Sequence, residues 1–456
     1  MSLDERASAR EYTFDRHGSE YRLEFEQLAA DMQTRCPVAW NDTYGGHWFA
    51  AGNREVFEIA RSADKVSNDL DRRNERRGYK GNSIPPIQAD VEPSFLAMDP
   101  PAQRHYRQAL NPYLSPAAVA RWQPVVAEVT RAAIDERIES GSIDFVDDLA
   151  NVVPAVLTLA MMGLPLKDWT IYCEPAHAGV YTKPDSPEMP RVIEASLETN
   201  RRLLAAVKDA RIHPRPGLID ALVNATIDGG KPSDEQLAGQ LGLIIGGGFD
   251  TTTALTAHAL EWLGEHPDQR ERLSIERESL LDSATEEFLR FYTPAPGDGR
   301  TISQDCEMAG VPFKEGERLW LSWAMANRDP AVFPEPNDII LDRSNNRHAS
   351  FGLGIHRCIG SNVARMTFKT MLTATLDRMP DFVCDPSGAI HYDTVGVING
   401  MKHLPATFTP SQRLGAGLDE TLEALQIACD QQGLAAPVTV RREAAHVSRQ
   451  TNNAGK

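Results

Sequence analysis

The sequence lacks the cysteine spacing of common structural metal sites and iron–sulfur clusters. Its six cysteines are scattered along 456 residues, at positions 36, 173, 306, 358, 384 and 429. No two of them form a C-x-x-C pair, which excludes a zinc ribbon and a ferredoxin-type cluster. Each cysteine must therefore be interpreted alone.

An excess of basic residues and a long apolar run are also missing. The chain carries 47 Lys and Arg against 64 Asp and Glu, a net charge of −17, which argues against a sequence-independent grip on nucleic acid or anionic lipid. The most apolar stretch, residues 152–166, is interrupted by Pro154 and Gly163 and is shorter than the roughly 20 residues of a membrane span.

The first ten residues contain no apolar signal-peptide core. We therefore expect a cytoplasmic protein with no membrane span and no nucleic-acid partner.

No repeat and no Gly/Ser-rich or Pro-rich linker divides the chain, which favours one large domain. Helical spacing of apolar residues predicts helices over residues 116–140, 144–162, 191–210, 233–264 and 283–291. Strand-like segments are few, at residues 48–51, 300–303, 318–323 and 393–404. The predicted fold class is therefore mainly α with small β-sheets.

Helix boundary residues support two of these helices. Ser115 before Pro116 is typical of an N-cap followed by a proline in the first turn, and Gly141 is a stop signal. Ser233 with Gln236 forms the sequence pattern of a capping box.

The most specific motif surrounds the fourth cysteine. Residues 351–360 read FGLGIHRCIG and precede the helical segment SNVARMTFKTMLTATLDRM. Gly352 and Gly354 permit tight turns and place Cys358 just before a helix N-terminus, where free N–H groups and the helix dipole favour a thiolate. A lone thiolate on a loop, without neighbouring metal ligands, suits the axial position of a haem iron.

This segment resembles the F-x-x-G-x-H-x-C-x-G signature of the cytochrome P450 family, the haem-thiolate monooxygenases. The resemblance implies haem b (iron protoporphyrin IX) as the cofactor and Cys358 as the iron ligand. It places Phe351, His356 and Gly360 in the haem-binding loop. It also implies a single large P450-like domain with the haem between the central helix and the cysteine-bearing loop.

A second match lies within the predicted helix 233–264. Gly247, Gly248, Phe249, Asp250 and Thr251 resemble the family's central-helix motif. Glycine inside a helix costs about 1 kcal/mol relative to alanine, so the bare surface needs a reason, and a haem face with bound dioxygen would be one. The Thr251 hydroxyl is spaced to bond the Gly247 carbonyl and loosen the helix. The resemblance implies that Gly247 and Gly248 border the cofactor and that Asp250 and Thr251 deliver protons.

Two further segments are similar to the family's haem-propionate positions. Residues 99–107 read DPPAQRHYR, in which Gln103 and Arg107 are spaced to reach one propionate. Arg300 and His356 match positions that bind the other, and Asp298 belongs to the same cofactor-binding segment. Arginine and protonated histidine supply charge-assisted hydrogen bonds to carboxylates.

The pair Glu287 and Arg290 matches the family's E-x-x-R, with both side chains on one helix face. Arg343 stands where the family places a second arginine. The resemblance implies that the three residues form a buried structural network that braces the haem-side loop.

Alignment with these motifs predicts an apolar substrate pocket and therefore an apolar small-molecule substrate. A terpenoid or steroid-like molecule is the first expectation and a fatty acid the second. The predicted lining consists of the loop 76–94, the region 172–189, Leu243, Ile244, Phe249, Ala295, Pro296, Val397 and Ile398.

The resemblance spans residues 36–410, preceded by an N-terminal segment, 1–35, and followed by an extension, 411–456. In the extension, residues 418–434 predict a short amphipathic helix, followed by disorder. The chain has no flavin or iron–sulfur motif, so electrons for O2 reduction are expected from a separate ferredoxin and NAD(P)H-dependent ferredoxin reductase. We expect a monomer. The predicted ferredoxin-docking patch consists of Arg104, Arg107, Arg357, Arg365 and Lys369.

Three alternatives remain open from the sequence. A peroxide-driven haem-thiolate peroxygenase would need no redox partner, but such members tend to replace the acid–alcohol pair that Asp250 and Thr251 form. A non-catalytic haem carrier or gas sensor would have no use for that pair. A haem-free helical binding protein would have to explain four motifs in the family's order.

Overall fold

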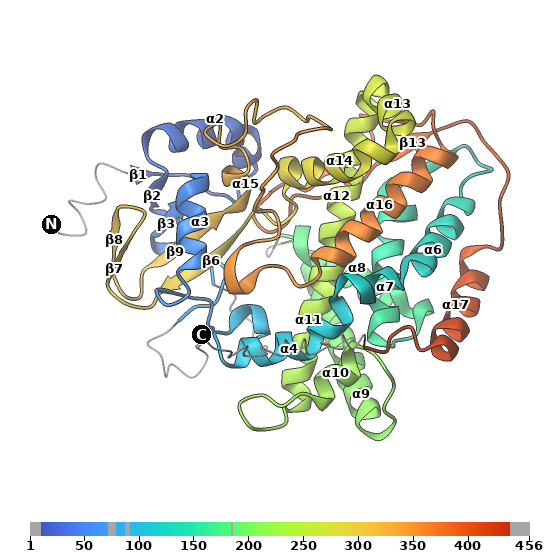
Figure 1. The fold of residues 1–456 in the computed structure, drawn as a ribbon, viewed down its shortest axis with the longest axis horizontal. Helices are drawn as coiled ribbons and strands as arrows, with labels where there is room; N and C mark the ends of the chain where they lie inside the picture. The colour runs from blue at the N-terminus through green and yellow to red at the C-terminus, as the bar shows by residue number, and fades with distance from the viewer. Residues whose placement is uncertain (1–10, 72–78, 87–91, 184–185, 438–456) are drawn as a thin grey trace, which may run out of the picture.

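The structure, a computed structural model, describes residues 11–71, 79–86, 92–183 and 186–437. In Figure 1, the strands β1, β2, β3, β6 and β9 gather at one side and most of the helices at the other. The prediction of a mainly helical fold with small sheets is confirmed.

Helices account for most of the described chain. The α-helices are α2 (Ser19–Arg35), α3 (Asn53–Arg61), α4 (Ala102–Leu114), α5 (Pro116–Ala120), α6 (Gln123–Asp135), α7 (Val152–Met162), α8 (Trp169–Tyr181), α9 (Met189–Ile212), α10 (Leu218–Asn224), α11 (Asp234–Gly248), α12 (Asp250–Glu265), α13 (Pro267–Ile275), α14 (Arg277–Tyr292), α15 (Trp323–Ala326), α16 (Ser361–Arg378) and α17 (Leu418–Gln432). Shorter helical turns are η1 (Thr43–Gly45), η2 (Phe95–Ala97), the π-helical η3 (Phe145–Ala150), η4 (Leu166–Asp168) and η5 (Gly354–His356).

The largest sheet has the order β1-β2-β3-β9-β6-β4 and joins N-terminal segments, up to residue 67, with the segments 297–302 and 318–322. Its strands are β1 (Glu11–Tyr12), β2 (Val38–Asn41), β3 (His47–Ala50), β4 (Val66–Ser67), β6 (Gly297–Ile302) and β9 (Arg318–Ser322). The smaller sheets pair β7 (Cys306–Met308) with β8 (Val311–Phe313), β11 (Ile390–His391) with β12 (Met401–His403), and β5 (Ser142–Asp144) with β13 (Pro405–Thr407) and β10 (Val383–Cys384). β3 runs parallel to β9 and β6 antiparallel to it, and Gly297–Ile302 lies between β9 and the edge strand β4.

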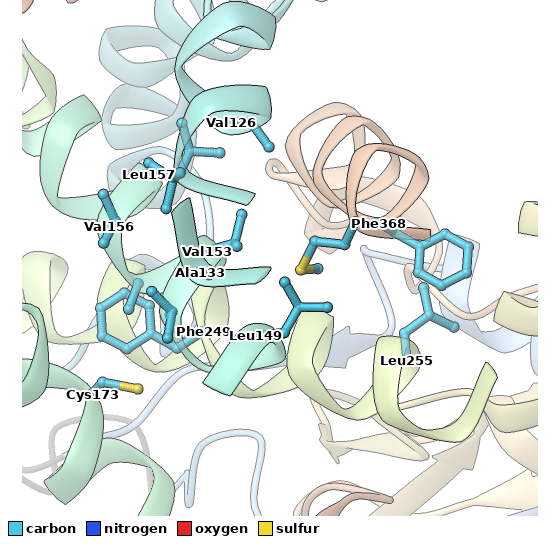
Figure 2. Packing of buried hydrophobic residues seen from close by; sticks show 14 of the residues in the cluster. Val126, Ala133, Leu149, Val153, Val156, Leu157, Cys173, Phe249, Leu255 and Phe368 are labelled. Atoms are coloured by element: carbon cyan, nitrogen blue, oxygen red, sulfur yellow. The ribbon is translucent and has the colours of Figure 1, made fainter. Parts of the chain in front are cut away.

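The main hydrophobic core lies among the helices α6, α7, α12 and α16 (Figure 2). The segment Phe145–Met162 is long and apolar enough to resemble a membrane span, but 89% of it is buried inside the fold. Pro154 is accommodated because it lies in the first turn of α7, where no hydrogen-bond donor is required. The apolar surface of this segment is therefore used in core packing.

Three of the predicted helices are divided: 116–140 into α5 and α6, 144–162 into η3 and α7, and 233–264 into α11 and α12. The helix predicted over 116–140 ends at Ala120 and restarts at Gln123, because Pro124 is accepted only in the first turn of a new helix. The predicted caps hold: Ala118 N–H donates to Ser115 Oγ at 3.3 Å, and Ser233 forms its capping box. The strand predicted over 393–404 is short, since only Met401–His403 is extended in a sheet.

The C-terminal extension begins with an anchored segment. The buried carboxylate of Asp135 accepts hydrogen bonds from the backbone N–H groups of Leu414 and Gly415 at 2.9 and 3.0 Å. Helix α17 then packs against α6. The disorder predicted after this helix falls largely on residues 438–456, which lie outside the described residues.

Candidate haem and substrate site

A cavity of about 640 Å³ separates the cysteine loop from helices α11 and α12. This volume is within the range of about 300–1,000 Å³ for ligand and cofactor pockets. Helices α4, α7, α11, α12 and α16, strand β6 and the loops at residues 82–86 and 396–397 line it. Most of the lining side chains are apolar, and a group of polar ones gathers at one edge.

The cysteine loop is shaped by its glycines and by its own backbone. The Cys358 N–H donates to the Phe351 carbonyl at 2.7 Å, which closes the loop. Gly354 has a φ of 68°, and a Cβ there would lie 2.4 Å from the Ala60 carbonyl oxygen. The loop therefore packs against α3 through a position that only glycine fits, and it leaves the Cys358 thiol at the cavity wall.

The surroundings of Cys358 shift the pKa of its thiol in opposite directions. Burial raises the pKa of the thiol, while the Gly360 N–H and the charges of Arg107, Arg357 and Arg365 pull it down. Coordination to a metal ion deprotonates a thiol outright. The sulfur at this wall is therefore a candidate metal ligand.

The opposite wall is the junction of α11 and α12. The sequence predicts one helix over 233–264, but the structure ends α11 at Gly248 and starts α12 at Asp250. The Thr251 hydroxyl donates to the Gly247 carbonyl at 3.1 Å, the contact expected to loosen the helix. A Cβ at Gly247 would meet no atom within 4 Å, so the helix presents bare backbone to the cavity.

Asp250 points away from the cavity into a small polar cluster. Its Oδ1 lies 2.6 Å from His177 Nδ1 on α8 and 2.9 Å from the Tyr392 hydroxyl. Its Oδ2 is buried and has no hydrogen-bond partner among the described residues. His177 lies in the region 172–189 that is predicted to line the pocket, but the sequence predicts no contact of His177 or Tyr392 with Asp250, because each is more than 70 positions away along the chain.

The polar edge of the cavity carries cationic side chains. Arg300 is buried and pairs with Asp298 at 2.5 Å, and Arg107 donates to the Arg357 carbonyl at 2.8 Å. Burial, reinforced by the charges of Arg300 and Arg107, lowers the pKa of His356 to about 3. Such a cluster favours an anionic ligand, since a carboxylate there would be attracted by both guanidinium groups.

Gln103 is placed differently from the other predicted cofactor residues. Its side-chain amide donates to the Ile355 carbonyl at 2.8 Å, which supports the cysteine loop from α4. It is not among the described lining residues. The remaining members of that set do line the cavity, namely Arg107, Gly247, Gly248, Asp298, Arg300, Phe351, His356, Cys358 and Gly360.

The residues around the cavity can be compared with those that would hold a haem. A cysteine sulfur would hold the iron of a haem-thiolate cofactor, cationic side chains would hold its propionates, and a wall without side chains would leave room for O2. Cys358, Gly247 and the Arg107 and Arg300 guanidinium groups supply these features around one cavity. The donor set of the site therefore fits the cofactor.

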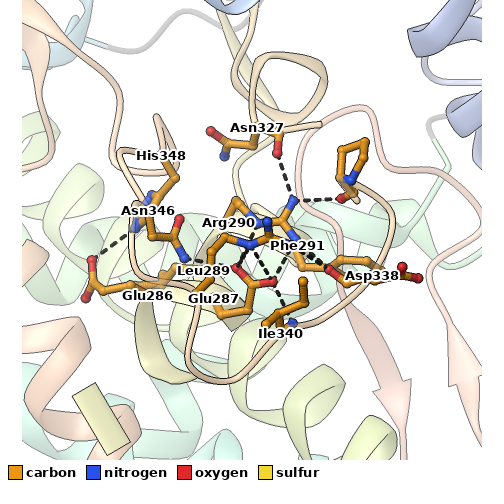
Figure 3. Close-up of polar contacts among 12 residues, drawn as sticks. Glu286, Glu287, Leu289, Arg290, Phe291, Asn327, Asp338, Ile340, Asn346 and His348 are labelled. Atoms are coloured by element: carbon orange, nitrogen blue, oxygen red, sulfur yellow. Dashed lines mark hydrogen bonds and ion pairs between the residues drawn. The ribbon is translucent and has the colours of Figure 1, made fainter. Parts of the chain in front are cut away.

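Glu287 and Arg290 lie against each other in Figure 3, and Arg343 joins them in one buried network. Arg290 binds both oxygens of Glu287 at 2.8 Å, and Arg343 Nε lies 3.0 and 3.1 Å from the same oxygens. Arg290 also donates to the carbonyls of Asn327, Pro336 and Asp338. The network thus ties α14 to the chain that leads to the cysteine loop.

The predicted substrate pocket is partly reproduced. Leu243, Ile244, Ala295 and Val397 line the cavity, as do residues 82–86 of the predicted loop. Pro296, Ile398, Phe249 and the described part of 172–189 do not. Ile398 packs with Ala254 and Tyr392, and Phe249 points into the helical core (Figure 2). These placements correct the predicted lining.

Two residues of the N-terminal segment, Arg16 and His17, also line the cavity, although no sequence motif predicts this. Arg16 is buried, its guanidinium lies 3.5 Å from the centre of the Trp320 ring, and it donates to the Gly396 carbonyl. His17 Nε2 lies 3.1 Å from the Ile84 carbonyl oxygen. The segment before α2 therefore connects two of the loops that enclose the cavity.

A helical domain in which one cysteine faces a glycine-lined helix across a cation-edged cavity has the architecture of a haem-thiolate protein. The cytochrome P450 family model matches residues 191–385. Cytochrome P450 123 from Mycobacterium tuberculosis is 30% identical over 364 residues, which cover 78% of this chain and 88% of that protein. A steroid C26-monooxygenase from Mycolicibacterium smegmatis is 28% identical over 413 residues, covering 85% of this chain and 91% of that protein.

Solved structures agree with these relatives. CYP109E1 from Bacillus megaterium, solved in complex with testosterone, has a TM-score of 0.75 and 26% identity, covering 86% of this chain and 99% of that one. A mutant of P450 EryK in complex with erythromycin B has a TM-score of 0.76 and 26% identity, covering 88% and 100%. The chain belongs to the cytochrome P450 family: it is a monooxygenase of the oxidoreductase class, and its cofactor is haem.

Proposed function

We propose that this P450 inserts one oxygen atom of O2 into an apolar molecule of the steroid or terpenoid class. The observation that carries the proposal is the apolar cavity between Cys358 and the junction of α11 and α12. The apolar side chains on its α11–α12 side suit a hydrocarbon skeleton. The curated steroid C26-monooxygenase and the testosterone complex of CYP109E1 support the same class. The side chains assigned to substrate contact are Leu110, Leu243, Ile244, Leu289, Ala295 and Val397.

Cys358 is the proposed iron ligand, and Arg107, Arg300 and His356 are the proposed propionate partners. When bound there, haem supplies the reduction and cleavage of O2 and the oxidation of the substrate. Gly247 and Gly248 keep the opposite wall free of side chains. Gln103 acts on the loop that carries the ligand, through its hydrogen bond to the Ile355 carbonyl.

Thr251 and Asp250 are the proposed proton-delivery residues. The Thr251 hydroxyl borders the cavity, and its bond to the Gly247 carbonyl fixes its position at the helix junction. Asp250 precedes Thr251 in the chain, and its Oδ1 is held by His177 and Tyr392, so this cluster is the proposed source of the proton that reaches Thr251. General acid catalysis by a positioned group typically contributes a factor of about 10²–10⁴.

Electrons are proposed to come from a ferredoxin and an NAD(P)H-dependent ferredoxin reductase. The docking patch is smaller than the sequence predicts, because Arg365 pairs with Glu286 at 2.6 Å and Lys369 pairs with Asp282 at 2.8 Å. Arg104, Arg107 and Arg357 remain its proposed cations. A monomer in the cytoplasm remains our expectation.

Spectroscopy of the purified protein tests this proposal. The reduced carbonyl complex should show the red-shifted Soret band of thiolate ligation, and Cys358→His should replace it with an imidazole-type spectrum. Titration with testosterone, farnesol and palmitate should then rank the substrate classes by the spectral shift that accompanies binding. A response to palmitate alone would overturn the steroid or terpenoid assignment. Product formed with peroxide but not with NADH and ferredoxin would favour the peroxygenase alternative.

A further inference from the structure

A cluster of metal-binding side chains lies outside the haem cavity. His258 and Glu261 project from α12, and His391 reaches them from β11. Their ligand atoms all lie within 4.8 Å of one another. His391 Nε2 is 2.8 Å from Glu261 Oε1, and His258 Nδ1 is 3.6 Å from Glu261 Oε2.

His258 has no hydrogen-bonding role in this cluster. Its side chain is 3% exposed, and both ring nitrogens lack a hydrogen-bond partner among the described residues. The 3.6 Å separation from Glu261 exceeds hydrogen-bond distance. One face of the ring is stacked on Tyr292 with a centroid distance of 4.6 Å and an interplanar angle of 7°. A buried polar group left unpaired in this way is unfavourable, so the site lacks a partner for this imidazole.

We propose that His258, Glu261 and His391 bind a divalent transition-metal ion, with Zn²⁺ as the expected occupant. Two imidazoles and one carboxylate form a donor set that zinc uses with solvent in its remaining position. His258 and Glu261 are three residues apart and share one helix face. Coordination would give the buried ring of His258 the partner that it lacks.

Access and charge are compatible with this assignment. The side chains of His391 and Glu261 are 35% and 18% exposed, so the cluster is open toward solvent on the side away from His258. The nearest cation is Arg22 on α2, whose Nη1 lies 3.5 Å from His391 Nδ1. Its positive charge opposes a divalent ion; Arg328, Asp393 and Glu265 are further charged groups near the cluster among the described residues. Arg22 is therefore expected to weaken metal binding without preventing it.

A bound ion would link α12 to the segment that contains β11, and the same two segments are also in contact at Asp250. Helix α12 begins at Asp250, and the residue after His391 is Tyr392, whose hydroxyl binds Asp250. A bound ion would hold β11 against α12 and thereby keep Tyr392 in place. The proposed role is structural and is separate from haem binding.

Metal binding is tested on the haem-loaded protein, freed of any affinity tag and treated with a chelator. Titration calorimetry with zinc chloride should show one ion per chain with micromolar or tighter affinity, and magnesium chloride should show none because Mg²⁺ prefers oxygen ligands. Zinc K-edge absorption, which is distinct from the iron edge, should report imidazole nitrogen and carboxylate oxygen at about 2.0–2.2 Å. Absence of zinc binding would overturn the proposal.

Matched variants locate the site. Glu261→Gln and His391→Ala should each weaken zinc binding about tenfold or more, whereas Arg22→Gln should strengthen it. His403→Ala is the control, because it removes the histidine of the exposed cluster of Asp144, Asp147 and His403. Zinc should raise the melting temperature of the wild type but not of His391→Ala. Equal affinity in Glu261→Gln, His391→Ala and the wild type, or loss of binding in His403→Ala, would contradict the assignment.

Discussion

The Tyr392 hydroxyl lies 2.9 Å from His177 Nδ1 and 2.9 Å from Asp250 Oδ1, so Tyr392 and His177 converge on a single carboxylate oxygen. The Asp250 side chain is 2% exposed, whereas that of His177 is 12% exposed. His177 is thus the member of the cluster that lies closer to solvent. A proton that reaches Asp250 has a short path through this imidazole.

Asp250→Asn should slow product formation by about tenfold or more, because an amide preserves the contacts but does not relay a proton. His177→Gln should slow it less, since Tyr392 still holds the carboxylate. The measurement is the rate of product formation with saturating ferredoxin, in H2O and in D2O. Substrate affinity, read from the spectral shift, is the control and should change little. An unchanged rate in Asp250→Asn would remove this residue from proton delivery.

Thr251→Ala should uncouple NADH oxidation from product formation. Without the hydroxyl, the protons are no longer positioned at the cavity wall, and we expect more of the NADH oxidised to yield hydrogen peroxide. Thr251→Ser retains the hydroxyl and is the matched control. Product and peroxide are measured per NADH oxidised. Full coupling in Thr251→Ala would mean that protons arrive by another route.

Arg290→Ala should destabilise the fold and reduce haem retention. Arg290 and Glu287 are both 0% exposed, and removal of one partner of such a buried pair typically costs about 3–5 kcal/mol. Arg272→Ala is the control, because its ion pair with Asp342 is 33% and 52% exposed, and such a pair contributes about 0–1 kcal/mol. The free energy of unfolding and the haem content are measured for both variants, and both quantities should fall only in Arg290→Ala. Equal stability of both variants would contradict a bracing role for the network.

The carboxyl group of Glu286 predicts a specific acid sensitivity. Burial alone would raise its pKa, but hydrogen bonds from Arg365 and His348 lower it to about 2 from an ordinary 4.5. A carboxylate with a depressed folded-state pKa stabilises the fold above its unfolded value, and this contribution is lost as pH falls from 4.5 toward 2. Glu286→Gln should therefore destabilise the protein at neutral pH, with the difference from wild type shrinking through that window. Denaturant unfolding at several pH values measures it, and a difference that grows on acidification would contradict the assignment.

Arg104→Glu should weaken ferredoxin-supported turnover at low salt while leaving the substrate-induced spectral shift intact. The reason is that rim charges act mainly on the rate of association, which salt screens. Lys369→Glu should have a smaller effect, since the lysine is already paired with Asp282. Turnover is measured across a salt series. Identical salt dependence in Arg104→Glu and the wild type would show that the partner docks elsewhere.

Local spacing made much of the site predictable. The contact of Glu287 with Arg290 follows from their positions three residues apart on one helix, and the Thr251 bond to Gly247 follows from a separation of four. The cysteine loop is likewise defined within ten residues. Such features depend on local geometry, which the sequence reports directly.

Contacts between distant segments were not predictable in the same way. His177 and Tyr392 are 215 residues apart, and nothing near either of them indicates Asp250. The errors in the pocket have a local cause instead. Ala295 and Gly297 line the cavity, as does Val397, whereas Pro296 and Ile398 do not. Residues 295–296 and 397–398 lie in irregular loops in which adjacent residues face different neighbours, so a continuous assignment includes residues that face away from the cavity.

The position of Arg16 connects the start of the chain to substrate selectivity. Arg16 rests on Trp320 and holds the Gly396 carbonyl, while His17 lies against Ile84. The segment ahead of α2 is thus a structural part of the chamber, although it is far in sequence from every catalytic motif. A chain shortened to begin at Ser19 would keep all of those motifs, but its cavity would have a different shape. Swapping this segment between relatives is therefore a way to change which molecules the enzyme accepts without altering its chemistry.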